Sequence, residues 1–185
     1  MQISEYLNKI IRELDYSVKE IHDLDAEMLV NAILESKKIF VAGAGRSGFM
    51  GKSFAMRMMH MGIDSYVIGE TVTSTFEKED LLIIGSGSGE TKSLITMAEK
   101  AKSIGGKIAT ITIFPDSTLG QLADMTITLP GSPKDQTVGQ TVTIQPMGSL
   151  FEQTLLLFYD AIILRFMEKK GLDSQKMYGK HANLE

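Results

Sequence analysis

Apolar residues recur at helical spacing through the first 36 residues of the chain. In the first segment they lie three or four residues apart, at Ile3, Leu7, Ile10, Ile11, Leu14 and Val18. A second set with similar spacing consists of Met28, Leu29, Ala32 and Ile33. This periodicity predicts two helices. The first helix lies ahead of the rest of the pattern, so we expect it to pack either on a partner subunit or on the protein's own sheet.

From residue 38 onward, short apolar runs alternate with helical segments. The runs predict five strands, at 38–42, 65–68, 81–84, 107–113 and 125–129, and the pattern predicts helices at 48–61, 90–104 and 117–123. Such alternation is typical of a parallel sheet that carries helices on both faces. We therefore expect an α/β fold, a three-layer α/β/α sandwich around a five-stranded parallel sheet. In such folds ligands bind at the edge where the strands end.

The last third of the chain contains an aperiodic segment followed by a long apolar helix. Residues 130–148 have no periodicity, and a loop of this length inside a domain is commonly functional or mobile. A helix predicted from Ser149 to about Lys170 is then apolar on nearly every side. One small sheet covers only one side of a helix, so we expect this long buried helix to form a subunit interface as well.

The length of 185 residues suits one domain with a full hydrophobic core. We expect the whole chain, 1–185, to form a single domain. Its core is expected at about 28–172, with a helical lead-in at 1–27 and a polar tail at 173–185.

The composition limits the chemistry that the chain can support. There is no cysteine, which excludes disulfides, thiolate nucleophiles and cysteine zinc sites, and the three histidines form no H-x-x-x-H pair. We therefore expect no metal. A net charge of −4 argues against a broad nucleic-acid surface. No apolar run approaches the roughly 18 residues that span a bilayer, and no signal-peptide core is present, so we expect a cytoplasmic protein without a membrane partner.

The stretch Ile83–Thr91, I-I-G-S-G-S-G-E-T, is the strongest candidate for a binding site. It follows a predicted buried strand and precedes a predicted helix. Glycines allow sharp turns and close approach to a ligand, and hydroxyl groups donate and accept hydrogen bonds without charge. Because free backbone N–H groups lie at a helix start, the stretch predicts an anion site, with phosphate as the expected anion. The alternative interpretation is a tight turn in which Ser88 and Thr91 only cap the helix.

A second glycine-rich loop, G-A-G-R-S-G at Gly43–Gly48, matches the dinucleotide fingerprint G-x-G-x-x-G between a strand and a helix. Glu70 follows the next strand, where an acid binds the ribose in dinucleotide sites. A dinucleotide-binding enzyme is therefore an alternative function. Two hydroxyl-bearing loops at one crevice fit a phosphorylated polar ligand better.

Several blocks of the sequence resemble the sugar isomerase, or SIS, family. The two glycine loops and the closing helix resemble SIS domains in general, which implies a flavodoxin-like fold. Further blocks resemble the 6-phospho-3-hexuloisomerase branch: M-H-M-G, P-G-S-P-K-D, I-Q-P-M-G-S-L-F-E-Q and the terminal H-A-N-L-E. This resemblance, over essentially the whole chain, implies interconversion of D-arabino-hex-3-ulose 6-phosphate and D-fructose 6-phosphate through an enediol. It implies no cofactor, and a role in formaldehyde assimilation or detoxification by the ribulose monophosphate route.

The resemblance also implies which residues bind the substrate. The expected ligands of the phosphate and the sugar hydroxyls are the side chains of Ser47, Ser86, Ser88 and Thr91 and the backbone amides of Gly87, Gly89 and Glu90. Arg46 either steers the phosphate or is an ordinary solvated or salt-bridged arginine. The expected partner is a phosphorylated keto-hexose.

Glu152 is the candidate base, because SIS isomerases place a glutamate in the last helix. A positioned base contributes about 10²- to 10⁴-fold to the rate. Its spacing from Ser149, S-x-x-E, also matches a capping box, in which the Glu152 side chain binds the Ser149 N–H. The spacing alone favours the cap, and the resemblance favours the base.

His60 and His181 are secondary catalytic candidates. A single histidine on a methionine-rich helix is more often a half-buried side chain, but SIS active sites often borrow residues from a neighbouring subunit. The resemblance implies a homo-oligomer, with a tetramer, a dimer of dimers, as the expected form. An arabinose 5-phosphate isomerase and a non-catalytic sugar phosphate sensor remain alternatives, although both usually carry further domains.

Overall fold

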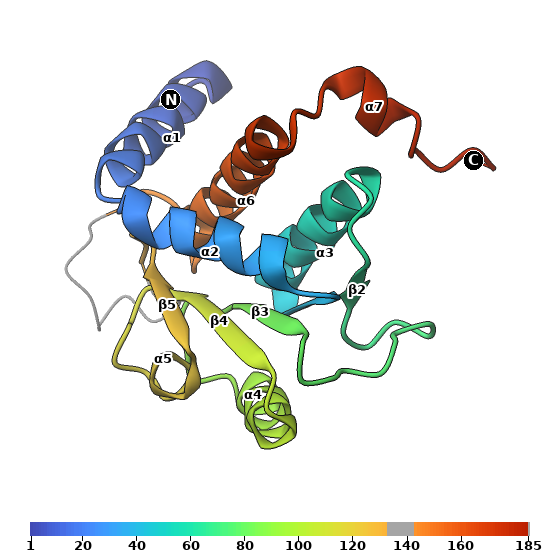
Figure 1. Cartoon of the computed structure of the whole chain (residues 1–185). Helices are drawn as coiled ribbons and strands as arrows, with labels where there is room; N and C mark the ends of the chain where they lie inside the picture. The colour runs from blue at the N-terminus through green and yellow to red at the C-terminus, as the bar shows by residue number, and fades with distance from the viewer. Residues whose placement is uncertain (133–142, 185) are drawn as a thin grey trace.

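The computed structural model describes residues 1–132 and 143–184, which form five strands and seven helices (Figure 1). In chain order these elements are α1 (Ile3–Lys19), α2 (Asp23–Glu35), β1 (Ile39–Gly43), α3 (Gly45–His60), β2 (Ser65–Val67), β3 (Leu81–Gly85), α4 (Lys92–Ile104), β4 (Lys107–Thr112), α5 (Thr118–Leu122), β5 (Met125–Thr128), α6 (Ser149–Lys170) and α7 (Ser174–Tyr178).

The five strands form one parallel sheet in the order β2-β1-β3-β4-β5. The sequence prediction of a five-stranded parallel sheet is confirmed. The chain proceeds from β1 outward to β2, then crosses to the other side of β1 for β3 and the later strands. The strand order thus reverses between β1 and β3, which is where ligands bind in open sheets of this type.

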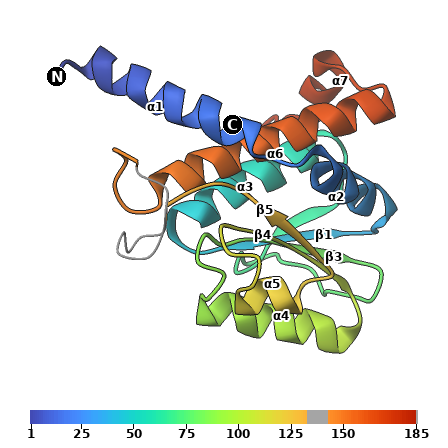
Figure 2. The ribbon, with the colours of Figure 1, turned by 90° about the vertical axis from the view of Figure 1, so that its left-hand side faces the viewer.

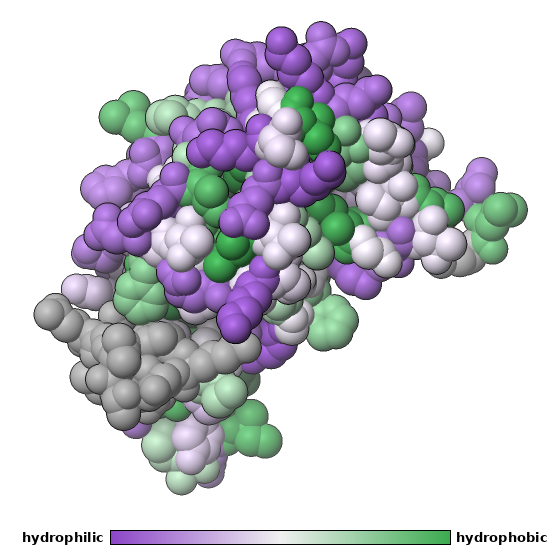
Figure 3. Space-filling view, turned by 90° about the horizontal axis from the view of Figure 1, so that it is seen from below, coloured by the Kyte–Doolittle hydropathy of each residue, from purple (hydrophilic) through white to green (hydrophobic). Residues whose placement is uncertain are grey.

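Two hydrophobic cores cover the two faces of the sheet, because successive strand residues point to opposite sides. Ile39 and Val41 of β1 pack with α2, α3 and α6, whereas Phe40 and Ala42 pack with α4 and α5. Figure 2 shows the resulting three layers, with α4 and α5 below the sheet and α2, α3 and α6 above it. The α4 side, which faces the viewer in Figure 3, is largely hydrophilic.

Helix α6 is more completely covered by its own chain than the sequence suggested. Helices α1, α2 and α3 contact it in addition to the sheet, so most of its apolar residues are buried without a partner. Leu157 and Leu164 stay exposed. The neighbouring helices cover the sides of α6 that the sheet leaves open.

Helix α1 packs on α6 and projects beyond the rest of the fold (Figure 2). Ser17 is its buried residue, and apolar side chains such as Ile3, Leu7 and Ile11 are exposed. The expected lead-in helix is therefore present, but its apolar stripe is largely uncovered. Helix α7 lies in the tail, where the polar sequence predicted no element.

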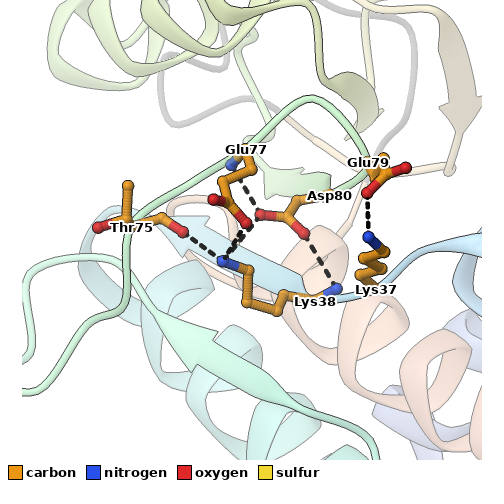
Figure 4. A network of polar contacts seen from close by, with 6 residues as sticks. All are labelled: Lys37, Lys38, Thr75, Glu77, Glu79 and Asp80. Atoms are coloured by element: carbon orange, nitrogen blue, oxygen red, sulfur yellow. Dashed lines mark hydrogen bonds and ion pairs between the residues drawn. The ribbon is translucent and has the colours of Figure 1, made fainter.

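The amino-terminal edge of the sheet is held by a network of charges (Figure 4). The buried carboxylate of Asp80 accepts hydrogen bonds from the N–H groups of Lys38 at 3.1 Å and Glu77 at 2.7 Å. The Lys38 ammonium group donates to the Thr75 carbonyl at 2.6 Å and lies 3.4 Å from Asp80. This network fixes the starts of β1 and β3, at the edge opposite the glycine loops.

No described helix is long and apolar enough to cross a membrane.

Candidate functional site

The two glycine-rich loops lie side by side because β1 and β3 are neighbours. Gly43 and Gly85, the last residues of these strands, are paired in register. The loops leave the sheet in different directions, since α3 covers one face and α4 the other. Together with the start of α6 they enclose a cleft of about 300 Å³, lined by Ala44, Ser47, Gly85, Ser86, Gly87, Ser88, Thr91, Leu94, Ile113, Ser132, Gly148, Phe151 and Glu152.

The first loop is tighter than predicted, because α3 begins at Gly45 and not near Gly48. Gly45 has a φ of 57°, which favours glycine. A Cβ on Gly48 would lie 2.7 Å from the carbonyl oxygen of Gly43, so only glycine lets the helix start this close to the strand. This packing places Ser47, which is buried, in the first turn of α3 and in the cleft wall.

The second loop is organised by its own hydroxyl groups. The buried Ser86 hydroxyl accepts a hydrogen bond from the Gly89 N–H at 3.2 Å, and the Ser88 hydroxyl accepts one from the Glu90 N–H at 3.2 Å. Thr91 is the N-cap residue of α4 but makes no side-chain cap bond. The expected cap therefore does not form at Thr91, and its side chain lines the cleft.

The backbone amides predicted as phosphate donors do not all lie open. Those of Gly89 and Glu90 donate within the loop, and neither residue lines the cleft, whereas Gly87 does. The Glu90 carboxylate accepts hydrogen bonds from the backbone and hydroxyl of Thr118 at 2.7 and 2.8 Å, which lower the pKa of Glu90. Glu90 thus ties the loop to α5.

Glu152 lies in the first turn of α6 with only 7% of its side chain exposed, and it lines the cleft opposite the second loop. Its carboxylate lies 3.3 Å from Nη1 of Arg46, which also donates to the Ser149 hydroxyl at 2.9 Å. The predicted capping box is wrong. The N-cap is Gly148, and the Ser149 N–H donates to the carbonyl of Pro146. The carboxylate therefore faces Arg46 and the cleft instead of the helix end.

His60 and His181 lie together, but away from this cleft. Their rings stack with centroids 5.1 Å apart, where the tail meets the C-terminal end of α3. Ser47 is near the opposite end of α3, and thirteen residues of helix correspond to about 20 Å. Burial, followed by the charges of His181 and Arg57, lowers the pKa of His60. Within one chain, neither histidine joins Glu152.

Glu70 does not take the position that the dinucleotide interpretation requires. Its carboxylate accepts a hydrogen bond from Lys52 at 2.5 Å, and both side chains are about half exposed. Glu70 is not among the residues that line the cleft. Among the described residues, no group of three or more His, Asp or Glu side chains is arranged to hold a metal ion.

Several cleft residues were not singled out from the sequence. Ser132, which is buried, and Phe151 contribute to the wall, as do Ala44, Ile113 and Gly148. Ser132 belongs to the P-G-S-P-K-D block, whose last three residues, Pro133 to Asp135, lie outside the described part of the chain. The signal available in the sequence was a serine in the aperiodic segment that follows the last predicted strand. Phe151 looked like any other apolar position of the last helix.

Known proteins match both the sequence and the fold. The SIS domain family model matches residues 32–157. A Bacillus subtilis protein named 3-hexulose-6-phosphate isomerase is 59% identical over 185 residues, covering 100% of both chains. A Mycobacterium gastri protein of the same name is 35% identical, covering 99% of this chain and 92% of its own.

A similar solved structure is that of a Methanococcus jannaschii protein whose molecular function was inferred to be 3-hexulose-6-phosphate isomerase. It has a TM-score of 0.82 and 38% identity, and the match covers 98% of this chain and 99% of that one. The similarity to these relatives and to this structure thus extends over nearly the full length of the chain.

Proposed function

The chain belongs to the SIS domain family, and we propose that its cleft binds an open-chain keto-hexose phosphate with Glu152 as the catalytic base. The proposed activity is the interconversion of D-arabino-hex-3-ulose 6-phosphate and D-fructose 6-phosphate, and the full-length relatives named 3-hexulose-6-phosphate isomerase support it. The observation that supports the site best is the buried carboxylate of Glu152 facing a loop of uncharged hydroxyl donors across one cleft.

The phosphate is proposed to bind at the second loop. Ser86, Ser88 and Thr91 line the cleft beside the start of α4, where the helix dipole favours an anion. Ser47 contributes a further hydroxyl from the first loop. The amides of Gly87, Gly89 and Glu90 are proposed as additional donors, and those of Gly89 and Glu90 become available when a phosphate oxygen replaces the serine hydroxyl that each now contacts.

The reaction moves a carbonyl group between C3 and C2. Glu152 removes the proton from C2 of the hex-3-ulose, which gives an enediolate across C2 and C3. The same carboxylate returns the proton to C3, while the hydroxyl proton of C2 passes to the oxygen of C3, so that the product carries its carbonyl at C2. A 3-ketose whose O6 is phosphorylated forms no unstrained five- or six-membered ring, so no ring-opening residue is required for the reaction that starts from the hex-3-ulose.

Arg46 is proposed to attract the dianionic substrate at the mouth of the cleft. Half of its side chain is exposed, and it pairs with Glu152. An arginine in this position steers an anion towards an otherwise acidic protein.

His60 and His181 are proposed to contribute to the active site of a neighbouring subunit. The surface offers a place for a second copy: the apolar stripe of α1 and a groove of about 410 Å³ between α1, α2 and α6 are uncovered. We propose a homo-oligomer, a tetramer formed as a dimer of dimers. The chain is proposed to act as one unit over 1–185 in the cytoplasm, on the ribulose monophosphate route of formaldehyde fixation or detoxification.

A coupled assay tests the function. Ribulose 5-phosphate, formaldehyde and a 3-hexulose-6-phosphate synthase supply the substrate, and fructose 6-phosphate is measured with the purified chain present or absent. We expect formation of fructose 6-phosphate that depends on the chain. Arabinose 5-phosphate, tested in parallel with detection of ribulose 5-phosphate, is expected to be a poor substrate. The reverse preference would assign the chain to the alternative SIS isomerase class.

A further inference from the structure

A carboxylate on α1 holds the segment that leads into the candidate active site. The side chain of Glu13 accepts hydrogen bonds from the Thr143 hydroxyl at 2.6 Å, from the Ile144 N–H at 2.9 Å and from the side-chain amide of Gln145 at 2.8 Å. These three donors belong to consecutive residues. We call residues 143–148 the strap, because they connect this contact to the first turn of α6.

The strap is also fixed at α6. The Gln153 side chain donates to the Gln145 side-chain oxygen at 2.5 Å, and Gln153 directly follows Glu152. Gln145 is buried, with 3% of its surface exposed. The chain of contacts therefore runs from Glu13 through Gln145 to the residue next to the proposed base.

The backbone between these anchors is constrained. Met147 has a φ of 60°, which is uncommon for a residue with a side chain and strains the backbone. The carbonyl of Pro146 accepts from the Ser149 N–H, and Gly148 lines the cleft. Strained backbone persists only where its surroundings hold it, and Glu13 provides such a contact.

The hydrophobic packing of α1 does not explain why a glutamate occupies position 13. Ser17 is the buried residue of α1, and much of the helix's apolar surface is exposed. Burial alone would raise the pKa of Glu13, but the three hydrogen bonds, with the charge of Lys9, outweigh it and lower the pKa. The Glu13 carboxylate accepts from three donors, whereas a glutamine has one acceptor oxygen and would turn its NH2 group towards at least one of them.

We propose that Glu13 is a positioning residue for the isomerase reaction: through the strap it sets the position of the first turn of α6, and thereby of Glu152. This inference rests on the proposed role of Glu152 as the base. It assigns to α1, a helix outside the cleft, a contribution to turnover in addition to any contribution to assembly.

The test is a double-mutant cycle of Glu13→Gln and Glu152→Gln, with kcat and KM measured for the isomerisation of fructose 6-phosphate. Glu13→Gln is expected to lower kcat about 10-fold and to change KM less than about 2-fold, since displacement of a catalytic group by 1 Å costs up to about 10²-fold. In the Glu152→Gln background, Glu13→Gln is expected to have no further effect, because it acts through that residue. Thr143→Val removes the hydroxyl that donates to Glu13 and accepts from the Gln145 N–H at 3.0 Å. It leaves two of the three donors to Glu13 in place and is expected to give a smaller fall in kcat.

Glu20→Gln is the matched control, since Glu20 is an exposed residue at the C-terminal end of the same helix. It is expected to leave kcat unchanged. Hydrogen exchange of residues 143–153 is expected to be faster in Glu13→Gln than in the control, while the global unfolding midpoint shifts little. A wild-type kcat in Glu13→Gln, or a fall of equal factor in both backgrounds, overturns the proposal. Full activity of Glu152→Gln would instead remove the base assignment itself, so the two failures are distinguishable.

Discussion

Nη1 of Arg46 lies 3.3 Å from the carboxylate of Glu152 and 2.9 Å from the hydroxyl of Ser149, so the first glycine loop is joined directly to the start of α6. Arg46 is about half exposed and Glu152 is nearly buried. The pair thus links a solvent-facing cation to the group proposed to move the proton.

Substitution of Arg46 tests whether this cation attracts the substrate. Arg46→Gln is expected to lower kcat/KM about 10-fold, and the dependence of kcat/KM on salt concentration is expected to weaken, because one steering charge is lost. Arg46→Lys keeps the charge and is expected to keep most of the salt dependence. The control is Lys52→Gln, an exposed cation of the same helix that pairs with Glu70. An unchanged salt dependence in Arg46→Gln would show that Arg46 does not steer the phosphate.

Ser86→Ala tests the phosphate loop. The Ser86 hydroxyl faces the cleft region and accepts from the Gly89 N–H, so its loss removes a ligand and loosens the loop. We expect KM to rise about 10-fold, the effect of losing one or more hydrogen bonds to a charged group, and kcat to change less. Ser93→Ala, at an exposed position of α4, is the control. A large fall in kcat with an unchanged KM would place Ser86 in the proton-transfer step instead.

The lowered pKa of His60, whose ring stacks on that of His181, predicts that the stability of the protein depends on pH. The pKa of His60 is lowered in the folded protein, so the unfolded chain binds the proton first as the pH falls below about 6.5. The free energy of unfolding is therefore expected to decrease between pH 7.5 and pH 5.5. Urea denaturation at these two pH values is expected to show a smaller decrease for His60→Gln than for the wild type. His22→Gln, at an exposed position, serves as the control, and an equal decrease in both variants would contradict the prediction.

The elements and the two loops could be predicted because their signals are local. The apolar runs of β1 and β3 and the glycine and hydroxyl residues that follow them are contiguous in the sequence, and parallel strands bring their ends together. The start of α3 was misplaced by three residues because the first helical residue, Gly45, has a positive φ and resembles a turn residue.

Contacts between distant residues could not be predicted in this way. The spacing of Ser149 and Glu152 matched a capping box, yet Arg46, far away in the sequence, binds both side chains and Gly148 occupies the cap. The contact of Glu13 with the strap could not be predicted either. The sequence around an acidic residue on a helix does not show which distant residues its carboxylate binds. The distance between His60 and the cleft follows from the length of α3, which the motif M-H-M-G does not reveal.

Exchange of substrate hydrogen with solvent in Glu152→Gln tests the central claim, that Glu152 moves the proton. Fructose 6-phosphate is incubated in D2O with the wild type or the variant, and isomerisation and deuterium incorporation at the reacting carbons are followed by NMR. Glutamine has the shape of glutamate and still accepts from Arg46, so the variant is expected to fold and to bind the substrate with a similar KM or inhibition constant. The wild type is expected to isomerise the sugar and incorporate deuterium, whereas in Glu152→Gln both rates are expected to fall about 10²- to 10⁴-fold. A catalytic base contributes at least about 10²-fold to the rate. Rates of isomerisation and deuterium incorporation in Glu152→Gln within about 3-fold of the wild type would therefore contradict the assignment of Glu152 as the base.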